Sequence, residues 1–77
     1  MPPTTPADQN LATAIRRLRA ERGETQEALA FGAGLTLSGY GRIERGEINP
    51  AWTTVREIAQ AFGLTMGELV AEVEREE

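Results

Sequence analysis

Apolar residues recur along the chain at the spacing of an α-helix. In two stretches they fall three or four positions apart, which places them on one face of a helix. These residues are Leu11, Ile15 and Leu18 in the first stretch, and Val55, Ile58, Ala59 and Phe62 in the second. No stretch alternates apolar and polar residues in the manner of a half-buried strand. The pattern therefore predicts an all-α fold.

Capping residues and glycines divide the chain into five predicted helices. Four of the predicted starts have a side chain that can accept a hydrogen bond from a free backbone amide. These residues are Asp8, Thr25, Thr36 and Thr65. Thr65 and Glu68 have the spacing of a capping box, and Asn49-Pro50 is a turn signal before the fourth helix. The predicted helices span residues 6 or 8 to 22, 26–33, 37–45, about 52–62, and 66 to about 73.

The length of 77 residues accommodates one small domain. Three prolines within the first six residues predict a flexible lead-in over residues 1–9, followed by a helical domain over 10–74 and an acidic tail over 75–77. Cysteine is absent, which excludes disulfides and thiolate metal sites. We expect Tyr40 and Trp52 to belong to the core, because a small domain needs large apolar side chains.

The junction between the second and third predicted helices carries the main functional signal. Both helices are about two turns long, and Gly34 and Leu35 lie between them. Short helices joined by a three- to four-residue turn that contains glycine are typical of the helix-turn-helix, whose second helix can enter the major groove. Tyr40 and Ile43 are predicted to face the interior. The predicted outward residues of the third helix are then Leu37, Ser38, Gly41, Arg42 and Arg45.

The charge distribution leaves DNA binding open. The formal net charge is −4, from 8 arginines and 12 acidic residues. Residues 1–56 contain seven of the arginines and six of the acids, so the acidic excess lies in residues 57–77. In the mildly basic part, Ser38 and Arg42 share one ridge, because they are four residues apart on a helix. Arginine can bind guanine in a bidentate manner, so this ridge has chemistry suited to base recognition.

Catalysis is not expected. Histidine and cysteine are absent, which removes the commonest general base and metal ligand and the usual nucleophile–base pairs. Residues 39–44 begin like a glycine-rich phosphate motif but end in Glu44, and no predicted strand precedes them. We therefore expect no metal, no cofactor and no small-molecule ligand. The longest uncharged stretch, residues 28–41, is shorter than the ~20 residues that cross a bilayer, and the N-terminus is unlike a signal peptide, so we expect a cytoplasmic protein without a membrane partner.

The motifs and their order resemble the phage repressor/Cro family of helix-turn-helix proteins. The matching segments are residues 16–23 (RRLRAERG), 25–30 (TQEALA), 42–46 (RIERG) with Asn49-Pro50, and 58–64 (IAQAFGL) with Glu68-Leu69. The resemblance covers residues 11 to about 73. It implies a compact five-helix domain, similar to that of the lambda repressor, that binds double-stranded operator DNA, usually as a homodimer. Small members of the family act as transcriptional repressors or as restriction-modification controller proteins.

The resemblance also implies roles for individual residues. The positions that match base-contacting residues are Thr36, Leu37, Ser38 and Arg42, and those that match phosphate-contacting residues are Gln26, Arg45 and Asn49. Arg19 and Glu44 match a pair that forms a salt bridge from the first helix to the third, and Gln26 also matches a residue that braces the third helix. The position of Leu37 is often glutamine in phage repressors, and leucine offers a base only an apolar contact with a thymine methyl group.

Gly39 and Gly41 are a second departure from a regular recognition helix. Each weakens the helix by up to about 1 kcal/mol relative to alanine, which suggests that DNA or another helix approaches the backbone there. We expect a homodimer surface near the fifth helix, because its apolar residues exceed what so short a helix can bury. These residues are Leu64, Met66, Val70 and Val73.

Several interpretations compete with these. Ser38 would serve equally well in the cap begun by Thr36, and Leu37 would serve as apolar filler or a dimer contact. The acidic residues near the C-terminus are either a solvated tail or a device that repels DNA. For the whole chain, the alternative function is a protein-binding adaptor or antitoxin-like module on the same fold, whose tail binds a basic partner. A further possibility is a DNA-binding domain whose sensing domain lies in another chain.

Overall fold

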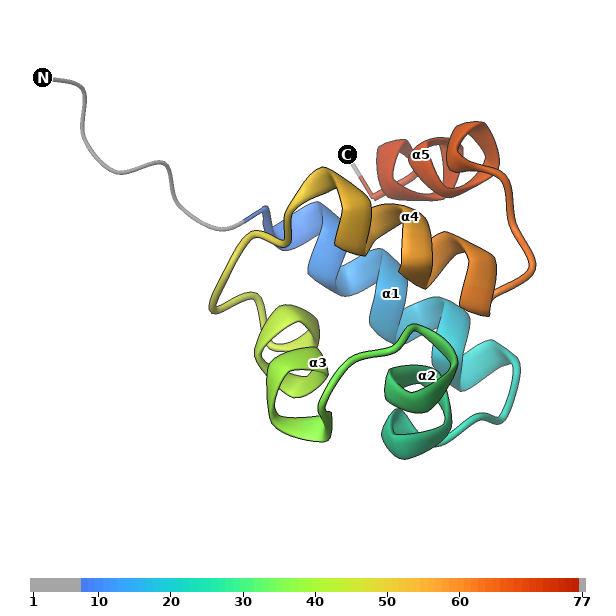
Figure 1. The fold of residues 1–77 in the computed structure, drawn as a ribbon. Helices are drawn as coiled ribbons and strands as arrows, with labels where there is room; N and C mark the ends of the chain where they lie inside the picture. Colours follow the sequence, from blue (N-terminus) through green and yellow to red (C-terminus); the bar gives the residue numbers. More distant parts are fainter. Residues whose placement is uncertain (1–7, 77) are drawn as a thin grey trace, which may run out of the picture.

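The computed structural model describes residues 8–76, which form five α-helices joined by short turns (Figure 1). The helices are α1 (Gln9–Glu21), α2 (Gln26–Gly32), α3 (Leu37–Glu44), α4 (Trp52–Ala61) and α5 (Met66–Glu74). No strand occurs within the described residues. The predicted all-α fold with five helices is thus confirmed. The lead-in was predicted over residues 1–9, but Gln9 is the first residue of α1. Residues 1–7 of the predicted lead-in lie outside the described part of the chain.

Side-chain caps set four of the five helix starts where the sequence predicts them. The Asp8 carboxylate accepts hydrogen bonds from the amides of residues 10 and 11. The hydroxyls of Thr25, Thr36 and Thr65 each accept a hydrogen bond from the amide three residues later. Thr65 and Glu68 form the complete capping box, whereas α4 begins at Ala51 without a side-chain cap.

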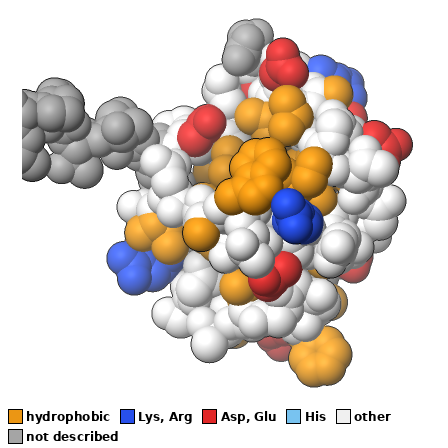
Figure 2. All heavy atoms as spheres, turned by 45° about the horizontal axis from the view of Figure 1, so that its top comes forward, with side chains coloured by type: hydrophobic (Ala, Val, Ile, Leu, Met, Phe, Trp, Pro, Cys, Tyr) orange, Lys and Arg blue, Asp and Glu red, His pale blue; other side chains and the backbone are white. Residues whose placement is uncertain are grey.

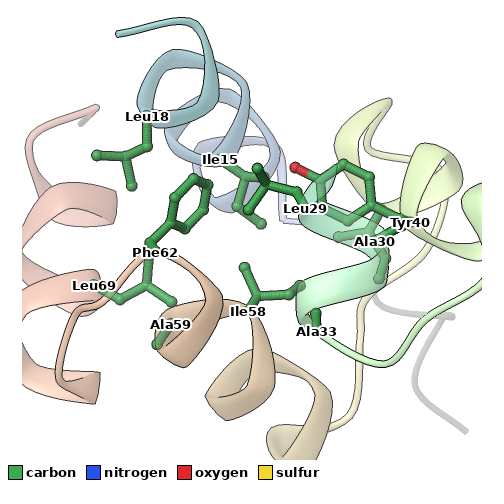
Figure 3. Close-up of a cluster of buried hydrophobic side chains, with 11 residues drawn as sticks. Ile15, Leu18, Leu29, Ala30, Ala33, Tyr40, Ile58, Ala59, Phe62 and Leu69 are labelled. Atoms are coloured by element: carbon green, nitrogen blue, oxygen red, sulfur yellow. The ribbon is translucent and has the colours of Figure 1, made fainter. Parts of the chain in front are cut away.

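The helices pack around one apolar core (Figure 3). α1 contacts α3 and α5, and α2 contacts α3 and α4, so that the second and third helices lie at one end of the molecule and α5 at the other (Figure 1). The apolar stripes of α1 and α4 supply Ile15, Ile58 and Phe62, and Leu29 and Leu69 close the core from α2 and α5. The described helices include none with the length and apolar character needed to cross a membrane.

Tyr40 and Trp52, both expected in the core, behave differently. Tyr40 is fully buried and anchors α3 to the core. The expectation for Trp52 is wrong, because its side chain is 62% exposed at the first residue of α4. Helical periodicity places Trp52 on the stripe of Val55 and Ile58, but it does not say how far along that stripe neighbouring helices extend.

Candidate nucleic-acid interface

The turn between α2 and α3 has the geometry of a helix-turn-helix. Gly34 adopts a positive φ of 71°, which residues with a side chain rarely adopt. Its amide donates to Phe31 O at 3.1 Å, and the Leu35 amide donates to Ala30 O at 2.8 Å. These two bonds form a Schellman motif, which ends α2 and redirects the chain into α3 within a few residues. The turn thus explains how two short helices meet so closely.

A buried polar cluster holds α3 against α1 and α2. Glu44 is only 1% exposed, and it accepts hydrogen bonds from Arg19 Nε at 2.9 Å and Arg19 Nη2 at 2.8 Å. Gln26 Nε2 donates to the same carboxylate at 3.0 Å. The structure therefore brings together the Arg19–Glu44 pair, and Gln26 braces it from the start of α2. Arg16 in α1 adds a hydrogen bond to the Glu44 backbone oxygen.

The environment of Glu44 keeps it ionised. Burial disfavours the charged carboxylate, but the hydrogen bonds from Arg19 and Gln26 outweigh burial and lower its pKa. Burial and the adjacent Glu44 raise the pKa of the Tyr40 hydroxyl well above its ordinary value. This cluster is the structural part of the site, and it determines which side of α3 faces outward.

The outward side of α3 carries the residues expected to face bases. Thr36, Leu37, Ser38 and Arg42 are all exposed. The Thr36 hydroxyl caps the Gly39 amide at 3.0 Å, while Ser38 and Arg42 lie on the open surface of the helix. The ridge predicted from the sequence is therefore accessible to a duplex.

Gly41 does not face outward as expected; it is buried. A Cβ atom at this position would lie 2.9 Å from Arg45 Nη1, and 3.7 and 3.9 Å from Arg45 Cζ and Nη2. The Arg45 side chain therefore folds back over one turn of α3 and covers the glycine. In the described structure the space beside this glycine is filled by an arginine of the same helix and not by another helix, and the close approach of DNA stays a prediction.

Glu47 is a residue of the site that the sequence analysis missed. Its Oε2 lies 2.6 Å from Arg45 Nε, and its Oε1 lies 3.8 Å from Arg42 Nε. The hydrogen bond from Arg45 lowers the pKa of the Glu47 carboxylate. The available signal was the spacing of an acid two residues after one arginine and five after another, across a glycine that ends the helix.

Asn49, expected to contact phosphate, has a structural contact as well. Its Oδ1 accepts a hydrogen bond from the Asp8 amide, which ties the loop after α3 to the start of α1. The residue is exposed, as is Arg45 at the end of α3. Arg45 and Asn49 thus lie on one segment that follows the outward ridge.

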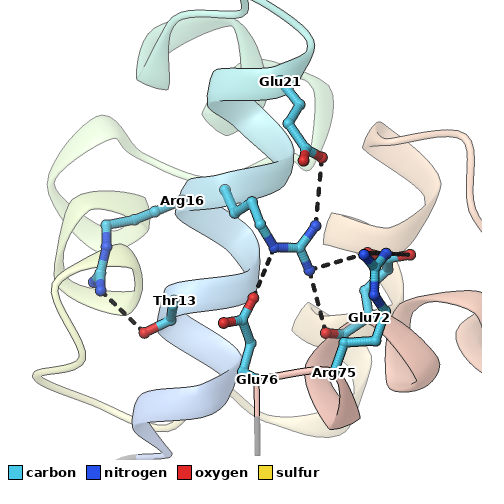
Figure 4. Close-up of polar contacts among 7 residues, drawn as sticks. Thr13, Arg16, Glu21, Glu72, Arg75 and Glu76 are labelled. Carbon is cyan, nitrogen blue, oxygen red and sulfur yellow. Dashed lines mark hydrogen bonds and ion pairs between the residues drawn. The ribbon is translucent and has the colours of Figure 1, made fainter.

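The C-terminal acids are not simply a solvated tail. Arg17 in α1 lies 3.0 Å from a Glu72 carboxylate oxygen and 2.7 Å from one of Glu76 (Figure 4). Glu21 also pairs with Arg17, at 3.4 Å. The carboxylates of Glu72 in α5 and Glu76 in the predicted tail are therefore engaged with α1, and Ser38 and Arg42 remain exposed.

The predicted dimer residues fall into two groups. Leu64 and Met66 pack against the core of the single chain but remain partly exposed, as does Val73, so the dimer surface near the fifth helix stays a prediction. Val70 is 42% exposed. Figure 2 shows hydrophobic side chains gathered on the face towards α4 and α5. The large exposed hydrophobic residues of these two helices are Trp52 and Val70.

Residues 10–73 match the sequence model of a helix-turn-helix domain family. The chain belongs to this family. Relatives include phage repressors and restriction-modification controller proteins, as the resemblance implied. The family is one of transcription regulators rather than enzymes.

Individual relatives support the same assignment. The chain is 43% identical over 54 residues to the uncharacterized regulator y4dJ of Sinorhizobium fredii, with 70% of each protein covered. It is 38% identical to the repressor RstR of the cryptic phage CTXphi in Vibrio cholerae, over 78% of this chain but 54% of RstR, so it spans about half of that relative's length. The crystal structure of the controller protein C.AhdI from Aeromonas hydrophila superposes with a TM-score of 0.74 and 35% identity, covering 78% of this chain and 91% of that one.

Proposed function

We propose that this helix-turn-helix transcriptional regulator binds operator DNA by placing α3 in the major groove. The observation that carries the proposal is the outward ridge of α3. Ser38 and Arg42 are exposed on it, while Tyr40 and Glu44 hold the opposite side of the same helix in the core. A helix that is anchored on one side and presents a hydroxyl and a guanidinium on the other is suited to direct base recognition.

The proposed contacts divide by chemistry. Arg42 reads guanine, Ser38 donates to or accepts from a base edge, and Thr36 and Leu37 lie against neighbouring bases, with Leu37 limited to apolar contact. Arg45, Asn49 and the remaining amide hydrogen of Gln26 bind phosphates and set the position of α3 on the duplex. Because these phosphate contacts are few, affinity should depend only modestly on salt for a DNA-binding protein.

We propose that the active form is a homodimer on a near-palindromic site. Two copies would present their α3 helices about one helical turn, ~34 Å, apart. Trp52 and Val70 replace Leu64 and Met66 as the central residues of the proposed contact, because they are the exposed apolar side chains of α4 and α5. Glu72 and Glu76 pair with Arg17 within the chain, so these two C-terminal acids give no support to the alternative of a tail that binds a basic protein partner.

Selection from random duplex DNA, followed by footprinting upstream of the gene, tests the function. We expect a two-fold symmetric consensus with half-sites one helical turn apart. The Arg42→Ala variant should then lose about 1–3 kcal/mol of binding free energy for that consensus and tolerate changes at one base pair, because the guanine contact is gone.

The matched control is Arg75→Ala, which removes the same charge from the end of α5, remote from α3 (Figure 1). This control should bind within about twofold of the parent at moderate salt. If Arg42→Ala remains folded and binds the consensus as tightly as Arg75→Ala does, α3 is not the recognition helix. If selection returns no consensus, the chain is not a sequence-specific DNA-binding protein.

A further inference from the structure

Glu47 is a charged residue beside the proposed DNA-binding surface with no part in the proposed DNA contacts. Its backbone position is set by the end of α3, where the Gly46 amide donates to Ile43 O at 3.0 Å and the Glu47 amide donates to Arg42 O at 2.9 Å. These are the two hydrogen bonds of a Schellman motif, and Gly46 has the positive φ, 71°, that the motif uses. The carboxylate is therefore held close to the outward arginines.

The Glu47 carboxylate engages both arginines, but not equally. It hydrogen-bonds Arg45 at 2.6 Å and lies 3.8 Å from Arg42. The side chains of Arg42, Arg45 and Glu47 are 54%, 56% and 49% exposed, so a nucleic acid can reach the cluster. The stronger contact involves the arginine assigned to the DNA backbone, and the weaker one involves the arginine assigned to a base.

Gly41 lies beneath the guanidinium of Arg45. The Arg45 guanidinium lies over Gly41, where a methyl group would come within 2.9 Å of Nη1. The glycine weakens α3, and this guanidinium occupies the space that a side chain at residue 41 would need. The Nη1 atom of Arg45 thus lies over Gly41, while its Nε atom hydrogen-bonds Glu47.

We propose that Glu47 competes with the DNA backbone for Arg45 and so weakens binding to duplexes of any sequence. The inference rests on the proposed function of α3. To bind a phosphate, Arg45 must exchange the Glu47 carboxylate for a phosphate oxygen, and the released carboxylate stays close to the DNA, where like charges repel. Phosphate contacts carry no sequence information, so the cost falls alike on operator DNA and on other DNA. Glu47 therefore lowers the affinity for DNA as a whole and leaves the preference for the operator unchanged.

The Glu47→Gln variant tests the proposal, with Glu74→Gln as the matched control. Glu74 is exposed on α5, and both changes remove one negative charge without changing side-chain size. Fluorescence anisotropy at one salt concentration compares a labelled random-sequence duplex with the selected consensus. We expect Glu47→Gln to bind both the random duplex and the consensus about three- to fivefold more tightly than the parent. Glu74→Gln should change either affinity by less than about twofold.

Equal or weaker binding of the random duplex by Glu47→Gln than by Glu74→Gln overturns the proposal. A second comparison tests the mechanism, because the gain from Glu47→Gln should be smaller when Arg45 is already alanine and only the repulsion between the carboxylate and DNA remains. If the gain is as large in that background, Glu47 acts on DNA by repulsion alone and the competition for Arg45 is wrong. The parent separates this inference from the proposed function. A parent without a preferred sequence contradicts the function, whereas a parent that binds its consensus without a gain in Glu47→Gln contradicts only the role of Glu47.

Discussion

Two glutamates at the end of α3 pair with arginines in opposite surroundings. Glu44 is 1% exposed and receives three hydrogen bonds, two from Arg19 and one from Gln26. Glu47 is about half exposed and shares its carboxylate between Arg45 and Arg42. The residue types and the shortest distances, 2.8 Å and 2.6 Å, are similar, so the two sites differ in solvent exposure and in the number of hydrogen bonds that the carboxylate accepts.

This difference separates a structural role from a functional one. A buried carboxylate cannot exchange its partners for water, so losing one partner leaves an uncompensated charge in the protein. An exposed carboxylate can exchange them, and its pair contributes little to stability. The Glu44 pair is therefore suited to holding α3, and the Glu47 pair to being displaced by DNA.

The largest effect is expected from Glu44→Gln. The amide keeps the size of the side chain but leaves the Arg19 guanidinium, 24% exposed, without a counter-charge. We expect a loss of roughly 2–3 kcal/mol in the free energy of unfolding, somewhat below the range for fully buried pairs because Arg19 retains some solvent. Urea unfolding followed by circular dichroism measures this loss.

Glu74→Gln is the control for this change as well, since Glu74 is exposed. Its unfolding midpoint should match that of the parent. A Glu44→Gln midpoint that also matches the parent would show that the neutral amide satisfies Arg19 and Gln26 as well as the carboxylate does, and that burial does not separate the two glutamates.

Low pH should remove the contribution of Glu44 to the free energy of unfolding. Its folded-state pKa lies below the ordinary value of 4.5, although burial opposes ionisation, because Arg19 and Gln26 bind the charged form. As the pH falls below 4.5, the unfolded chain takes up the proton first, so the stability gained from ionised Glu44 is lost through the folded-state pKa.

The measurement is the difference in unfolding free energy between the parent and Glu44→Gln, taken at pH 7 and at several values below 4.5. The other carboxyl groups are common to both proteins and cancel in this difference. The gap should narrow steadily in acid. A gap that stays constant to the acid limit would mean that the charge of Glu44 is not what stabilises α3.

The sequence predicted the backbone of this protein better than its side-chain contacts. Helix starts follow from local chemistry, since Asp8 and Thr36 hydrogen-bond amides two or three residues away. Contacts that depend on the extent of a neighbouring helix or side chain could not be predicted from local sequence in this way. Trp52 continues the apolar stripe of α4 beyond the point where other helices cover it, so its side chain is exposed. Gly41 is buried because the side chain of Arg45, one turn later, lies over it.

The candidate site shows the same division. The exposure of Ser38 and Arg42 follows from the helical period once Tyr40 faces the core. The pairing of Glu47 with Arg45 required the direction of the chain after Gly46, and periodicity says nothing about residues beyond a helix end. The assignment of individual residues to bases and phosphates came from the family resemblance, and it stays a prediction.

The smallest effect on stability is expected from Arg17→Ala. This variant tests ion pairs whose exposure lies between that of the Glu44 pair and that of the Glu47 pair. Arg17 is 25% exposed and pairs with Glu72 and Glu76, which are 23% and 19% exposed. We expect its unfolding midpoint to fall by less than about a third of the shift caused by Glu44→Gln, because its partners can be rehydrated when it is removed. The shift should also shrink in about 1 M salt, where the Debye length is only about 3 Å, whereas the shift of Glu44→Gln should persist. Equal shifts that respond equally to salt would contradict the comparison. Arg17 and Arg19 are similarly exposed, so that result would mean that the burial of Glu44 does not make its ion pair more stabilising than the pairs of Arg17.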